Sequence, residues 1–184
     1  ITMNAANFSL GGVNVADNSS LVSSTGNILI QNNQGAHTLV VTLPAQSLIE
    51  ASTGDVTFNQ VGAEGAITVN GGAGVGTTGG IRAGNSALEI NEVTFNGGTN
   101  QVSVGVDYIH GCVGGTGDPF LLTVQNVSPF TNDVHLGDIS THMDFSFTSP
   151  GNLTICGPIT ASNVGADPSI TLNTANGGTL IQET

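Results

Sequence analysis

Short segments of β-favouring residues recur along the whole chain, and nearly every one is bounded by glycine, asparagine or serine. They lie at 27–30, 38–43, 55–58, 66–69, 92–95, 102–106, 120–127, 133–139, 143–147, 152–156, 169–172 and 179–182. Apolar residues seldom recur at the three-to-four spacing of a helix without an intervening glycine. Only 44–52 offers enough for one or two helical turns. The pattern predicts an all-β protein.

A five-residue phrase repeats among these segments: glycine, a small or polar residue, then two apolar residues separated by one position. It reads GNILI from Gly26, GDVTF from Gly54, GAITV from Gly65 and GNLTI from Gly151. Glycine permits a corner, and the alternating apolar side chains would point inward. The step from Gly54 to Gly65 is about half of a solenoid coil of about 20–25 residues. We therefore expect a right-handed parallel β-helix, a β-solenoid whose corner asparagines bond from coil to coil.

The alternative fold is an antiparallel β-sandwich or jelly roll, since strands separated by turns at about 8–12 residue spacing fit that architecture too. The repeated phrase favours the β-helix. Two glycine-rich stretches, 71–80 and 111–118, are expected to be loops or close backbone contacts and not domain boundaries. We expect one β-rich domain over 1–184, which can be a segment of a longer chain.

The charge balance excludes several partners. Thirteen acidic residues face one basic residue, which gives a net charge of −12. Binding to nucleic acid or to an anionic membrane surface needs several cations, and no apolar run is long enough to span a bilayer. Arg82, the only base, is expected to make a surface contact. Lysine normally protects sheet edges, so its absence predicts a homo-oligomer or filament formed by β-edge pairing.

A family resemblance rests on the same phrases. The run GNLTICGPITAS from Gly151 to Ser162 resembles the repeats of filamentous-haemagglutinin-type exoproteins and autotransporter passenger domains, and GNILIQN, GDVTFNQ and GAITVNGGAGV are similar to them. The resemblance implies a long right-handed parallel β-helix, exported to the cell surface, that serves adhesion or carries other domains. It implies an extracellular or cell-surface location, with glycans or a host surface as partners. It implies no functional residue.

One cluster of residues has metal-binding chemistry. If 133–139 is a strand and Ser140 and Thr141 form a turn, two imidazoles and two carboxylates would converge on a divalent metal. This candidate metal site is Asp133, His135, His142 and Asp144. The alternative is a row of exposed polar residues on the strand. Calcium or another divalent ion held by loop oxygens is a further possibility at Asp17, Asp107 or Asp118, although no EF-hand spacing is present. Otherwise we expect no cofactor.

The cysteines test the fold. Cys112 and Cys156 are separated by two coils of about 22 residues, so straight stacking would place them about 9.6 Å apart. A disulfide needs Cα atoms within about 7 Å. We therefore expect buried free thiols, because a disulfide would require longer coils or the sandwich. His110, two residues before Cys112, is expected to be a loop histidine with its hydrogen bonds satisfied.

These observations predict a structural protein and not an enzyme. The acidic residues occur singly, and no nucleophile motif or phosphate-binding loop is present. The expected function is the β-rich scaffold of a secreted surface adhesin or a self-assembling extracellular filament. The alternatives are a carbohydrate-binding or carbohydrate-active β-helix and a viral fibre segment.

Overall fold

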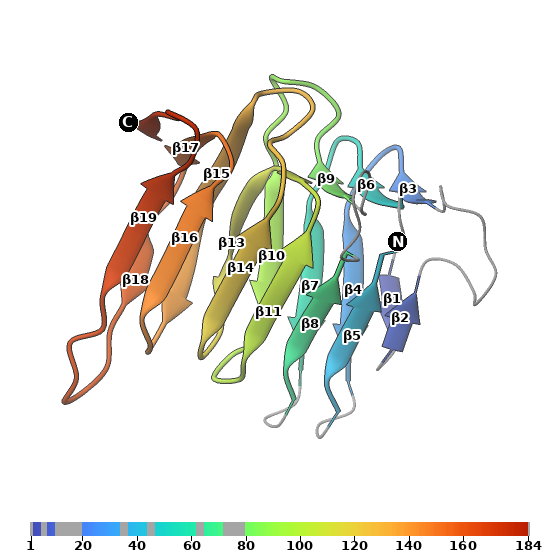
Figure 1. Ribbon diagram of the computed structural model, residues 1–184. Helices are drawn as coiled ribbons and strands as arrows, with labels where there is room; N and C mark the ends of the chain where they lie inside the picture. The colour runs from blue at the N-terminus through green and yellow to red at the C-terminus, as the bar shows by residue number, and fades with distance from the viewer. Residues whose placement is uncertain are drawn as a thin grey trace.

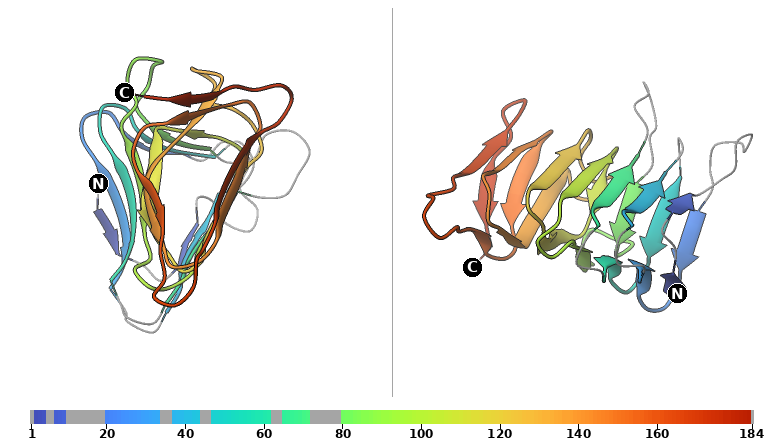
Figure 2. Two further views of the ribbon diagram at one scale, coloured as in Figure 1. Left: turned by 90° about the vertical axis from the view of Figure 1, so that its left-hand side faces the viewer. Right: turned by 90° about the horizontal axis from the view of Figure 1, so that it is seen from below.

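The chain forms a three-sided parallel β-helix. The computed structural model describes residues 2–4, 7–9, 20–33, 37–43, 47–61, 65–71 and 80–183. All pairings between strands in this part of the chain are parallel, and its one antiparallel bridge is an isolated contact between Asn163 and Ala166. The view along the coil in Figure 2 shows the three-sided cross-section. The predicted all-β solenoid is confirmed, and the sandwich alternative is wrong.

Each face of the coil is a stack of parallel strands (Figure 1). Face A contains β1 (Thr2–Asn4), β4 (Ile28–Asn32), β7 (Val56–Gln60), β10 (Glu92–Asn96), β13 (Cys112–Thr116), β15 (Asp133–Thr141), β17 (Asn152–Ile155), β18 (Ile159–Ala161) and β20 (Leu180–Gln182). Face B contains β2 (Asn7–Ser9), β5 (Leu39–Thr42), β8 (Ile67–Asn70), β11 (Val102–Val106) and β14 (Phe120–Val124), beside which lie β16 (Phe145–Ser149) and β19 (Ile170–Thr174). Face C contains β3 (Ser20–Ser23), β6 (Leu48–Ala51), β9 (Gly80–Ala83) and β12 (Ile109–His110). No described residue belongs to a helix that could span a membrane.

The repeated glycine phrase marks the corners of the coil. Gly26 and Gly54 precede β4 and β7, which pair one coil apart, whereas Gly65 precedes β8 on the next face. The step from Gly54 to Gly65 is therefore one side of a three-sided coil and not half of a two-sided one. Coils also vary in length, because hydrogen bonds between successive coils join residues 28, 37 or 19 positions apart. Loops at the corners absorb the difference.

Three local predictions differ from the structure. Residues 48–51 form the strand β6, where the sequence offered a short helix; residues 44–46 lie outside the described ranges. Within the glycine-rich stretch 111–118, residues 112–116 form β13 on face A, and only the close backbone contact is confirmed. The strand expected to end at Ile139 continues to Thr141. Neighbouring coils decide each case, since a parallel partner on either side supplies the hydrogen bonds that hold an extended backbone.

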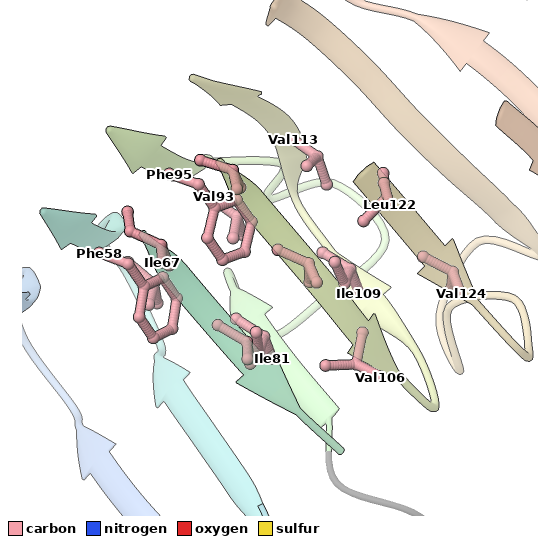
Figure 3. Packing of buried hydrophobic residues seen from close by; sticks show 14 of the residues in the cluster. Phe58, Ile67, Ile81, Val93, Phe95, Val106, Ile109, Val113, Leu122 and Val124 are labelled. Atoms are coloured by element: carbon pink, nitrogen blue, oxygen red, sulfur yellow. The ribbon is translucent and has the colours of Figure 1, made fainter. Parts of the chain in front are cut away.

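The interior is filled by columns of stacked apolar side chains. Phe58 and Phe95 occupy the same register position in successive coils, and their rings stack with centroids 4.9 Å apart. Phe120 on face B meets Phe95 edge-on at 6.4 Å and contacts Phe145 at 6.1 Å, so the aromatic contacts continue through four coils. Figure 3 shows these columns converging from the faces of the coil. The alternating apolar residues of the sequence point inward, as predicted.

Hydrogen bonds at the corners join one coil to the next. Asn27 Oδ1 accepts the backbone N–H of Asp55 at 3.0 Å, and Asp55 Oδ1 accepts that of Glu92 at 3.1 Å. Asn152 Oδ1 accepts the backbone N–H of Thr179 at 3.0 Å in the same way. The expected coil-to-coil bonds of corner asparagines are confirmed. Their partners are backbone N–H groups instead of other asparagines, so aspartate serves equally well.

Candidate functional sites

His110 forms a buried polar cluster under the loop that follows β14. Its Nε2 lies 3.1 Å from the carbonyl oxygens of both Ser86 and Glu89, so Nε2 carries the proton and donates. Its Nδ1 therefore accepts the hydroxyl proton of Ser128 at 2.7 Å. His110 is a strand residue of β12, fully buried, and its hydrogen bonds are satisfied. The Ser128 hydroxyl is also buried, so this histidine and serine hold the loop in place and do not form an open nucleophile.

Arg82 continues this cluster toward face C. Its guanidinium bonds to Glu50 at 2.6 Å, from the adjacent strand β6, and lies 5.4 Å from the ring centroid of Phe130. That ring packs edge-on against His110. The expected surface contact is wrong, because Arg82 is largely buried and cross-links two coils. Partial burial makes such an ion pair stronger than an exposed one, since less water screens it.

The four residues of the candidate metal site do not converge. Asp133 and His142 lie at opposite ends of β15, because the strand runs on through the position where a turn was expected. Asp133 and His135 approach each other at 4.0 Å, whereas His142 bonds to Asp118 and Asp144 accepts from Ser169. No group of three His, Cys, Asp or Glu side chains in the described ranges is arranged to hold a metal ion. The loss of the turn separates the two halves of the cluster.

Asp118 and His142 form a pair at one corner of the coil. The Asp118 carboxylate accepts from the His142 ring Nδ1 at 2.6 Å, from its backbone N–H at 2.5 Å and from the Thr141 hydroxyl at 3.0 Å. Burial alone would raise the pKa of Asp118, but these three donors together lower it. The carboxylate closes the corner between successive coils.

The remaining calcium candidates also have local roles or lie outside the structure. Asp107 accepts a hydrogen bond from the Asn126 amide at 2.5 Å. Asp118 is occupied by His142 and Thr141. Asp17 lies outside the described residues. The two described aspartates thus bond to other side chains of the chain itself.

Cys112 and Cys156 form a disulfide with Cα atoms 6.2 Å apart, so the expected free thiols are wrong. Two coils do separate the cysteines, but the coils approach more closely here than in straight stacking. A Cβ atom on Gly114 would lie 2.4 Å from the Gly137 carbonyl oxygen, and one on Gly137 would lie 2.3 Å from the Gly157 nitrogen. The absence of side chains at these three positions permits the close approach.

A shallow hollow of ≈ 280 Å³ lies on the outer surface of face A beside the disulfide. It is lined by Glu92, Thr94, Asn96, Cys112, Gly114, Gly115, Thr116, Gly137 and Asp138, which belong to β10, β13 and β15. We call it the face A hollow. No residue in it was predicted as a site, although the glycines of the stretch 111–118 were a sequence signal for missing side chains.

Acid is expected to destabilise the protein before most carboxylates titrate. Burial lowers the pKa of both His110 and His135 below the usual 6.5, so the unfolded chain binds protons that the folded chain does not. The free energy of unfolding should therefore fall as the pH drops through about 6.5. We expect a lower melting temperature at pH 5 than at pH 7.5, measured by circular dichroism.

The double variant H110Q/H135Q should show a smaller difference between the two pH values than the unmodified protein. The exposed His37 supplies the matched control, H37Q, which should keep the full difference. Equal acid sensitivity in the double variant and the unmodified protein would show that other groups are responsible.

Comparisons with protein family models, with curated proteins and with solved structures find no significant match to this chain. The resemblance to adhesin repeats therefore remains a prediction from the sequence.

Proposed function

We propose that this chain is a structural coil of an extracellular protein, the β-rich scaffold of a surface adhesin or of a self-assembling filament. Its faces are continuous parallel sheets, and its described side chains mostly fill the interior or join one coil to the next. The disulfide supports an oxidising, extracytoplasmic compartment, where such bonds persist. The observation that carries the proposal is the open apolar end at β19 and β20.

The C-terminal coil exposes residues that are interior residues elsewhere. Leu180 pairs in register with Leu153, which is fully buried, yet Leu180 is 56% exposed. Ile181 and Ile170 of the same coil are 41% and 42% exposed. No described segment stacks on β20, so this end presents both apolar surface and an unpaired strand edge.

A second copy of the chain is the occupant that fits this end. β1 and β20 lie at opposite ends of the face A stack, and each has an edge with no partner among the described strands (Figure 1). Because the two edges differ, contact between copies joins the end of one to the beginning of the next. A head-to-tail contact of this kind continues without closing and yields a filament.

The assembly test compares two exposed apolar residues. We expect the unmodified protein to form larger species as its concentration rises, seen by light scattering after size exclusion and by electron microscopy. L180D should abolish this growth, because it places a charge on the stacking surface. V164D is the matched control: Val164 is fully exposed in a loop, and the same added charge there should leave assembly unchanged.

A monomer at every concentration up to several hundred micromolar would overturn the proposal. So would equal growth in the L180D and unmodified proteins.

A further inference from the structure

The face A hollow exists because side chains are missing from the middle of the sheet surface. Thr94 projects outward from β10, and its register partner on β13 is Gly114. The next strand, β15, contributes Gly137 beside it. A Cβ atom at Gly114 would meet the Gly137 carbonyl oxygen, so the packing of the backbone itself keeps this depression empty.

The hollow combines an apolar floor with an unpaired polar rim. Its floor consists of glycine backbone and the Cys112 end of the disulfide. Glu92 and Asn96 lie on β10, and Asp138 lies on β15. The side chains of these three residues have no hydrogen-bonding or ion-pair partner in the described part of the chain. They are therefore free to bind a ligand.

The charge and the spacing of the rim exclude two ligand classes. Two carboxylates on a chain of net charge −12 repel anions, including sulfated and sialylated glycans. Glu92 and Asp138 stand on strands two steps apart, about 9–10 Å by sheet spacing. A single calcium ion binds its oxygen ligands at about 2.3–2.6 Å, so these carboxylates are too far apart to share one ion.

We infer that the face A hollow binds one neutral sugar residue of a glycan. Sugar hydroxyls would donate to Glu92 and Asp138 and exchange hydrogen bonds with Asn96, and bonds to carboxylates are the stronger kind. The C–H face of the ring would rest on the glycine and disulfide floor. A volume of ≈ 280 Å³ lies near the lower limit of about 300 Å³ for small-molecule sites, which suits one ring.

The test uses saturation-transfer NMR with free monosaccharides: glucose, galactose, mannose, fucose and N-acetylglucosamine, with sialic acid and glucose 6-sulfate as anionic probes. We expect signal from at least one neutral sugar and none from the anionic ones. E92Q/D138N should weaken that binding at least tenfold. Asparagine tolerates the φ of 53° at position 138, so the double variant keeps the backbone.

A second pair of variants separates the hollow from the rest of the sheet. T94V removes a hydroxyl from the hollow without changing side-chain shape, and it should weaken sugar binding. T57V is the matched control, because Thr57 holds the same register position as Thr94 one coil earlier and does not line the hollow. It should bind as the unmodified protein does. Circular dichroism checks that each variant is folded.

Three results would overturn the inference: no signal from any neutral sugar, equal binding by E92Q/D138N and the unmodified protein, or binding that is lost when EDTA removes calcium. The inference concerns the side of the coil and does not depend on assembly. L180D, used in the assembly test, should bind the sugar normally, so either proposal can fail without the other.

Discussion

Replacing Phe95 with alanine is expected to lower the free energy of unfolding by about 3–5 kcal/mol. The Phe95 side chain is fully buried, stacks on Phe58 and meets Phe120 edge-on. Its removal leaves a cavity that neighbouring coils cannot close, because each is held in register by the strands on both sides. Guanidinium denaturation followed by circular dichroism should show the lower midpoint.

The control is L88A, because Leu88 is 95% exposed and loses no packing. Its effect should stay within about 0.5 kcal/mol. If F95A and L88A behaved alike, the aromatic column would not be the source of stability that its geometry indicates.

Removing the disulfide is expected to cost about 2–4 kcal/mol. The bond closes a loop between residues 44 positions apart and so restricts the unfolded chain. It also holds together the coils of β13, β15 and β17, near the end where the apolar surface is open. The double variant C112S/C156S should therefore melt at a lower temperature than the oxidised protein.

Reduction of the unmodified protein with dithiothreitol should lower its melting temperature toward that of the variant. The variant itself should not respond to dithiothreitol, which makes it the internal control. An unchanged melting temperature after complete reduction, verified by thiol titration, would contradict this expectation.

Local sequence determined much of the architecture. The apolar alternation after Gly26, Gly54 and Gly151 places inward columns on face A, and the corner residue Asn27 bonds to the next coil as predicted. These features follow from one backbone repeat distance and one side-chain alternation, both of which act between near neighbours. They can therefore be predicted without knowing the other coils.

The candidate sites could not be predicted with the same success. The proposed metal cluster required a turn after Ile139, and the strand instead continues because β13 and β18 pair with it there. The disulfide depends on how closely three coils approach at Gly137, which no spacing in the sequence specifies. The buried contacts of His110 and Arg82 involve a loop folded back from another coil.

By itself, the sequence determined that this chain is all-β, that its strands stack in parallel and which alternate residues face inward. Only the tertiary structure decided the three-sided cross-section, the disulfide, the open apolar end and the face A hollow. The physical reason is the range of the interactions. Glycine corners and side-chain alternation are local, whereas register between coils and the closeness of their backbones depend on loops of very different length.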